Sequence, residues 1–227
     1  IQNTEQMISL EDFIQIFNSN DETKIIELSE MLPKLINSCD NDSIDSLKAI
    51  TESTEAAEIF GSVLSMTDSE NLLHSLLTSL IFIFPLFSND AKKEIINSGV
   101  AIKIDEILSN FFESSNVDLL FESCNLITVL SSNSSYARDS FLCYSVNERL
   151  INMLTTISTS FEENQIDDGS NQIISSLSQA IQSIYSNLYL VDNLSDLSTD
   201  SVVTQMIELI PILIGVNLEA TRSILSC

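Results

Sequence analysis

The sequence predicts an all-α protein, and its composition and periodicity carry that prediction. Only 4 glycines and 3 prolines occur in 227 residues, too few for a β-sandwich or barrel, which needs turn residues about every 8–12 positions. No two glycines stand close enough to build the phosphate loop of a nucleotide-binding α/β fold. Apolar residues make up 44% of the chain and recur at helical spacing almost from end to end, which is enough to bury a sizeable core.

Capping signals and apolar stripes set the first predicted helices. Ser9 precedes two acidic residues and an apolar run, which is typical of an N-cap and a first helical turn. The polar segment 18–21 then interrupts the chain. In the next segment Ile25, Leu28, Leu32 and Leu35 form an amphipathic stripe. Pro33 lies inside this segment and predicts a kink or a break.

The rest of the chain is also predicted to be helical. A cap at Asp68 or Ser69 opens a long helix that closes near Pro85. Gly99 suits the left-handed position after a helix. The further predicted helices are 43–50, 53–66, 69–84, 89–96, 100–112, 116–130, 134–144, 146–157, 170–190 and 199–214, with another starting at Asn217.

A short, a medium and a long helix recur as one unit. The long helices start at Ser69, Asn116, Ser170 and Asn217, at spacings of 47, 54 and 47 residues. Units of roughly 40–47 residues are typical of armadillo and HEAT arrays, and the longer spacing contains an acidic segment, 161–169, that we expect to be an exposed loop. The sequence therefore predicts an armadillo/HEAT-type right-handed α-solenoid. We expect one array over 1–227 without internal domain boundaries, with units at about 9–66, 67–113, 114–161 and 168–215 and the start of another at 216–227.

Five segments resemble the armadillo repeats of importin-alpha, the adaptor that carries basic nuclear localisation signals. They are 9–21, 34–37, 91–99, 136–142 and 201–214, and the likeness covers most of the chain in register. The resemblance implies a nuclear import adaptor that binds an extended basic peptide in a concave groove and works in the cytoplasm, the nucleus or both. It also implies an importin-beta-like carrier as a partner, recruited through a basic N-terminal arm that this chain does not contain.

The family's binding residues are not carried over to this sequence. In importin-alpha, exposed Trp and Asn residues four apart on the third helix of each unit line the groove. The Trp rings flank Lys or Arg side chains, and the Asn amides hold the peptide backbone. The corresponding positions here are Ser79 and Ile83, Asn125 and Val129, and Gln179 and Ser183, and the acidic residue of the family falls at Asn97. None of them matches, and the chain has no tryptophan.

Periodicity still predicts a small polar groove on the third helices. Its candidate lining residues are Ser75, Ser79, Ile83, Glu122, Asn125, Val129, Ser175, Gln179 and Ser183. A solvated helix face without a partner explains the same polar stripes.

Charge sets the class of partner that we expect. A net charge of −24 repels phosphate backbones and anionic lipid heads, so we expect no nucleic acid and no membrane partner. The most apolar run, 76–87, is too short to span a bilayer. Proteins or extended peptides, basic ones above all, are the expected partners.

The sequence contains no pattern typical of an enzyme or a metal site. Its four cysteines, Cys39, Cys124, Cys143 and Cys227, are far apart and accompany one histidine, His74. This spacing fits neither a zinc site nor a small disulfide framework, and it is typical of reduced thiols in a cytosolic or nuclear protein. His74 lies in an apolar helix, where a structural histidine is the simpler interpretation. We expect no catalytic site, no metal and no cofactor.

Two minor patterns and the chain end complete the expectations. Lys92-Lys93 is interpreted as a helix-surface feature. Two groups of aromatic residues are interpreted as core, the pair Phe111–Phe112 and the run Phe82, Phe84 and Phe87. The segment 221–227 resembles the opening turns of another helix, so we expect a longer parent protein or self-association to cover it.

Three functions stay open: an import adaptor, a scaffold for another protein segment without a transport role, and, least favoured, an enzyme on a helical array.

Overall fold

The computed structural model describes residues 8–36, 41–114, 116–160, 168–186 and 199–227, with the side chains of 199–202, 215 and 216 left aside. Over these ranges the chain consists of α-helices, one 3-10 turn and short connections, and it contains no strand. The all-α class predicted from composition is confirmed. The chain forms two compact parts, Ile1–Lys103 and Ile104–Cys227. Residues 161–167 of the predicted acidic loop and 187–190 of a predicted helix lie outside the described residues. Asp168 and Gly169 were expected in the same loop but form the start of a helix.

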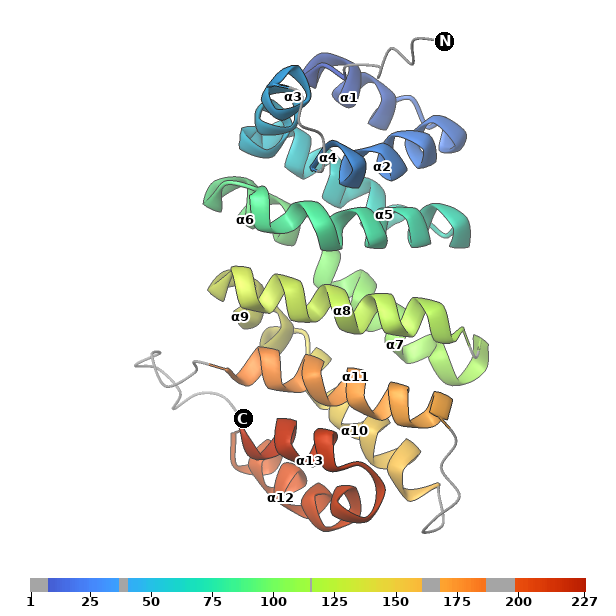
Figure 1. Ribbon diagram of the computed structural model, residues 1–227, viewed down its shortest axis with the longest axis vertical. Helices are drawn as coiled ribbons and strands as arrows, with labels where there is room; N and C mark the ends of the chain where they lie inside the picture. Colours follow the sequence, from blue (N-terminus) through green and yellow to red (C-terminus); the bar gives the residue numbers. More distant parts are fainter. Residues whose placement is uncertain (1–7, 37–40, 115, 161–167, 187–198) are drawn as a thin grey trace. The chain divides into compact units, whose positions relative to one another are not determined.

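The N-terminal part is a stack of short and medium helices. Its elements are α1 (Leu10–Phe17), α2 (Glu22–Ile36), α3 (Asn41–Glu52), α4 (Thr54–Met66), α5 (Glu70–Ile83), η1 (Phe84–Leu86) and α6 (Asn89–Asn97), followed by α7 (Val100–Ser114), which begins in this part. α2 packs along α5, while α4 packs against α1 and α6 (Figure 1). Helices far apart in sequence are therefore neighbours, as in a repeat array.

The C-terminal part repeats this arrangement. Its elements are α8 (Val117–Asn133), α9 (Ser135–Cys143), α10 (Val146–Thr159), α11 (Asp168–Tyr185), α12 (Thr199–Val216) and α13 (Leu218–Leu225). α11 packs against both α8 and α13, so that these three helices lie side by side (Figure 1), and α10 packs against α11 and α12. The helix starts predicted at Ser69, Asn116 and Asn217 are confirmed as N-caps, each with its side chain accepting a hydrogen bond from a backbone N–H. The start predicted at Ser170 lies inside α11, which begins two residues earlier at Asp168.

Two local expectations are confirmed, and one of the two alternatives predicted at Pro33 is excluded. Ser9 caps α1 in a reciprocal arrangement with Asp12, and Gly99 adopts φ 95°, the left-handed region that favours glycine. Of the kink or break predicted at Pro33, the break does not occur, because α2 continues through the proline. Pro33 has no N–H to donate to the fourth residue before it, but buried leucines at 28, 32 and 35 hold the helix on the core on both sides of the proline.

An aromatic cluster forms the core of the N-terminal part. Phe13 and Phe17 of α1 stack with ring centroids 4.4 Å apart, and Phe17 stacks on Phe60 of α4 at 5.2 Å. All three rings are at most 1% exposed. Gly61, next to Phe60, allows α4 to approach α6, since a Cβ there would lie 2.8 Å from Ser98 Cβ.

Two interpretations of exposed and buried side chains are corrected by the structure. Phe82 and Phe112 were expected in the core but are 55% and 53% exposed, whereas Phe84 and Phe87 are buried as predicted. Phe82 lies on the same side of α5 as the exposed His74. Lys92 was expected at the surface but is 9% exposed, and its ammonium donates to the Pro85 carbonyl at 3.3 Å. Burial lowers the pKa of Lys92.

Candidate peptide-binding groove

The three groove positions predicted on α5 are buried. Ser75, Ser79 and Ile83 are 8%, 1% and 0% exposed. The Ser75 hydroxyl points to the neighbouring helix α2 and donates to the Ile26 carbonyl at 3.4 Å. The polar stripe expected here is therefore part of the helix packing and is not available to a ligand.

A register error of one residue explains this correction. Counting 47 residues back from Asn125 and Val129, the spacing of the long-helix starts, leads to Thr78 and Phe82 rather than to Ser79 and Ile83. Thr78 is half-buried and Phe82 is exposed. One residue rotates a position by about 100° around a helix, which is enough to exchange a surface face for a packed one.

The C-terminal part contains a polar groove across α8, α11 and the start of α13, with a volume of about 480 Å³. It brings together three of the predicted residues, Asn125 of α8 with Ser175 and Gln179 of α11. The other lining residues are Phe121, Asn171, Gln172, Ser176, Asn217 and Glu219. We call this surface the amide groove, because five of its nine side chains are Asn or Gln.

Asn217 holds one wall of the amide groove in place. Its side-chain oxygen accepts a hydrogen bond from the Ala220 N–H at 2.9 Å and so caps α13. Its side-chain nitrogen donates to the Asn171 carbonyl at 3.3 Å and to the Ser175 hydroxyl at 3.2 Å. Ser175 is therefore already engaged within the protein and helps to fix α13 against α11.

Three predicted positions do not reach the amide groove. Glu122 and Val129 are half-buried on α8 and do not line the groove. Ser183 is 8% exposed, and its hydroxyl donates to the Ala180 carbonyl at 2.7 Å. Each lies three or four residues, about one helical turn along the axis, from Asn125 or Gln179.

Some groove residues were missed by the sequence analysis, and the repeat spacing could have found one of them. Phe121 lies 54 residues before Ser175, the spacing that separates the two long-helix starts, so the same rule that identifies Ser175 identifies Phe121. Asn217 and Glu219 were not predicted as groove residues, because the sequence indicates Asn217 only as the start of a helix. The packing of α13 against α11 turns this start into a groove wall.

The exposed chemistry of the amide groove is neutral hydrogen bonding with one carboxylate. Asn125, Gln172, Gln179 and Glu219 are exposed, and Phe121 offers a half-buried ring. A primary amide both donates and accepts hydrogen bonds. The groove contains no histidine, cysteine or lysine that could act as a nucleophile or base.

Other chemistry-bearing residues do not gather into a site in the described ranges. No group of three His, Cys, Asp or Glu side chains there could hold a metal ion. Cys124, Cys143 and Cys227 are free thiols, and burial raises the pKa of Cys124 and of Cys227 to about 12, which keeps both as unreactive thiols. Cys39 lies outside the described residues. None of the helices in those ranges has the length and apolar character to cross a membrane.

Comparison with known proteins identifies the fold but not a natural family. No family model and no curated protein matches the sequence. Among solved structures, an engineered protein superposes with a TM-score of 0.61 at 14% identity, covering 95% of this chain and 76% of that one. A designed armadillo repeat protein superposes with a TM-score of 0.52 at 13% identity, covering 96% of this chain and 98% of that one. The chain has an armadillo-like repeat fold. The predicted α-solenoid is thereby confirmed.

Proposed function

We propose that this chain is a non-catalytic binding scaffold that holds an extended peptide segment of a partner protein in the amide groove. One observation carries the proposal: Asn125, Gln172 and Gln179 expose their amides in a single recess, from helices that lie side by side. The armadillo-like fold supports it, since repeat arrays use extended surfaces of this kind for binding.

Side-chain amides suit the backbone of an extended peptide. Each amide can donate to a peptide carbonyl and accept from a peptide N–H, and this pairing does not depend on the peptide's side chains. Packed helices lie about 8–10 Å apart, and an extended chain advances about 3.3 Å per residue. Neighbouring helices such as α8 and α11 therefore meet the peptide about every third residue.

Two further residues give the amide groove a side-chain preference. The half-buried Phe121 ring offers an apolar contact, and the exposed Glu219 carboxylate at the other wall favours a cation. We therefore expect a peptide with an apolar residue and, a few positions away, a Lys or Arg.

Selection from a random peptide library tests this function. Peptides enriched on the wild-type protein are measured by fluorescence anisotropy against the Asn125→Ala/Gln179→Ala variant. We expect about tenfold weaker binding, because two hydrogen bonds of about 0.5–1.5 kcal/mol each are lost.

A matched control removes two exposed amides outside the groove. Asn110→Ala/Asn152→Ala changes α7 and α10 and should leave the affinity unchanged, with circular dichroism confirming that both variants fold. Equal affinity of all three proteins, or no enriched peptide, would contradict the proposal.

A second candidate is the importin-alpha-like adaptor that the sequence resembles. The net charge of −24 favours it, because attraction to Lys- and Arg-rich cargo persists without specific aromatic contacts. Nuclear transport, an importin-beta-like carrier and a location in the cytoplasm or nucleus belong to this candidate. The lack of tryptophan in 227 residues makes the general scaffold the better-supported function.

Titration of a fluorescent basic nuclear-localisation peptide at physiological salt separates the two candidates. Micromolar or tighter binding that is lost when the peptide's lysines become alanine supports the adaptor. Without binding even at low salt, the adaptor is excluded and the general scaffold stands.

A further inference from the structure

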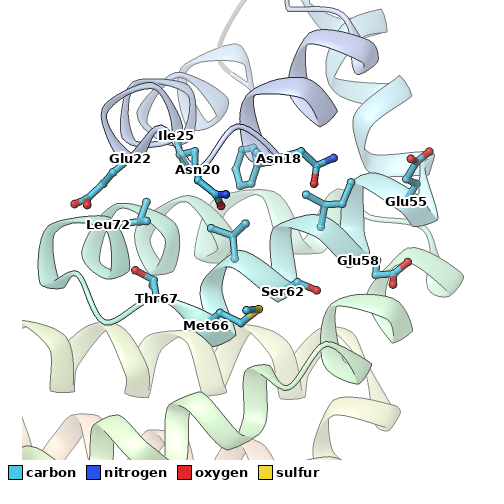
Figure 2. A pocket seen from close by; sticks show the side chains of 13 residues that line it. Asn18, Asn20, Glu22, Ile25, Glu55, Glu58, Ser62, Met66, Thr67 and Leu72 are labelled. Carbon is cyan, nitrogen blue, oxygen red and sulfur yellow. The ribbon is translucent and has the colours of Figure 1, made fainter.

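A second recess lies in the N-terminal part, separate from the amide groove. It has a volume of about 740 Å³ and is formed by the α1–α2 turn, α4 and the start of α5 (Figure 2). We call it the acidic cleft. Its lining combines apolar side chains with three carboxylates, which distinguishes it from an ordinary solvated surface.

The centre of the acidic cleft is apolar. Phe17, Ile25 and Leu72 line it and are at most 6% exposed, so they form its floor. Met66 lies at the edge and is 81% exposed. A thioether side chain of this kind adapts to the shape of a partner's apolar residues.

Carboxylates lie at the ends of the acidic cleft. Figure 2 shows Glu22 on one side and Glu55 and Glu58 on the other. Glu22 accepts a hydrogen bond from the Ser69 hydroxyl. Among the described residues, Glu55 and Glu58 form no ion pair, and the nearby Lys24 is paired with Asp21 at 3.0 Å. Glu55 and Glu58 thus place two exposed negative charges beside an apolar recess, and no cation of the described residues pairs with them.

The spacing of the lining residues indicates the shape of the occupant. Glu55, Glu58, Ser62 and Met66 recur along one side of α4 at steps of three or four. This stripe is about 16 Å long, at 1.5 Å per residue. A stripe along one helix, with Met66 at one end and Glu55 and Glu58 toward the other, fits the face of a second helix.

We infer that the acidic cleft docks an amphipathic, cationic helix of a partner protein. The apolar side chains of this helix fill the recess beside Met66, and its Lys or Arg residues lie against Glu55 and Glu58. Charge complementarity selects this occupant, since a neutral or acidic helix leaves two carboxylates facing apolar or negative groups. The inference does not depend on the amide groove, which lies in the other part of the chain.

Methyl NMR on the whole chain tests the inference. The sequence has 5 methionines, so labelling of their terminal methyl carbons gives few signals, and Met66→Leu assigns that of Met66. The probe is a synthetic peptide of Leu and Lys in helical periodicity, added at physiological salt. We expect a saturable shift of the Met66 signal, and no shift with counterparts that carry Glu for Lys or Ser for Leu.

Two matched double variants distinguish the cleft from general charge attraction. Glu55→Gln/Glu58→Gln should weaken binding of the Leu–Lys peptide about fivefold. Glu27→Gln/Glu30→Gln removes the same charge from exposed positions of α2 outside the cleft and should leave the affinity within about twofold.

Three results would overturn the inference. The first is an unchanged Met66 signal at saturating peptide, and the second is equal weakening in the two double variants. The third is a Met66 signal that shifts with protein concentration alone, because a second copy of the chain would then be the occupant.

Discussion

The acidic cleft and the amide groove are both recesses between helices, but they relate to the protein core in opposite ways. Phe17 lines the acidic cleft and also stacks on the core ring of Phe60. In the amide groove, Asn125 and Gln179 are exposed, and hydrogen bonds from Asn217 join the α11 and α13 walls. The cleft is therefore an opening into the core, while the groove is a surface laid over it.

Because of this difference, substitutions in the acidic cleft are expected to change the stability of the fold, whereas substitutions of the exposed amides in the amide groove are not. Changes at the floor of the acidic cleft affect packing, because Phe17, Ile25 and Leu72 are core residues. Changes to the exposed amides of the groove affect only hydrogen bonds that a ligand can use.

The largest effect is expected when an aromatic core residue is truncated. Phe60→Ala should reduce the free energy of unfolding by about 3–5 kcal/mol and shift the Met66 methyl signal, because the Phe17 ring that lines the acidic cleft loses its stacking partner. Urea unfolding followed by circular dichroism measures the first effect, and methyl NMR the second.

The matched change in the C-terminal part is Phe141→Ala, which also removes a fully buried ring. It should cost a similar free energy while leaving the Met66 signal in place. A shift of that signal in Phe141→Ala of the same size as in Phe60→Ala would break the comparison.

A smaller reduction in the free energy of unfolding is expected for a substitution where α4 approaches α6. Gly61→Ala places a Cβ 2.8 Å from Ser98 Cβ and 2.9 Å from the Ile95 carbonyl oxygen, and this overpacking should cost about 1–3 kcal/mol. Thermal unfolding measures it. Ser62→Ala, the next residue of α4 and half-exposed, is the control, and an equal midpoint for both variants would show that the close approach is not required.

A reduction of about 1 kcal/mol in the free energy of unfolding is expected for a substitution at the wall of the amide groove. Asn217→Ala removes the N-cap of α13 and the donor to Ser175. Asn217→Asp keeps the capping oxygen but lacks the donor, so it should recover most of the stability. If Asn217→Ala and Asn217→Asp unfold at the same denaturant concentration, the N-cap at Asn217 does not stabilise the α13 wall of the groove.

The smallest effect concerns acid sensitivity at α1, next to the acidic cleft. The Ser9 side chain and backbone donate to Asp12 and hold the pKa of its carboxyl below the ordinary value of 3.8. A carboxyl whose pKa is lower in the folded state stabilises above its unfolded pKa, and this contribution disappears as the pH falls through the folded pKa. Asp12→Asn should therefore reduce the loss of stability between pH 7 and pH 3, measured by urea unfolding at both values. An unchanged pH dependence would contradict this assignment.

The sequence by itself determined the helices and their order. The caps at Ser9, Ser69, Asn116 and Asn217 and the left-handed turn at Gly99 follow from local hydrogen bonding and backbone geometry, which depend on a few neighbouring residues. The repeat spacing led to the α-solenoid, and helical periodicity together with the importin-alpha resemblance led to Asn125, Ser175 and Gln179 as candidate groove residues. These features are periodic, and periodicity is visible in a single chain.

Only the tertiary structure decided which faces stay open. On α5 a one-residue difference in register buries Ser79 and Ile83 and leaves Thr78 half-buried and Phe82 exposed. The sequence alone does not show which helix packs against this face and so decides between the two registers. The acidic cleft had no sequence signal, because Phe17, Glu58 and Leu72 come from three helices that meet only when the chain packs. The physical reason is that burial depends on contacts between distant segments, whereas helix formation depends on near ones.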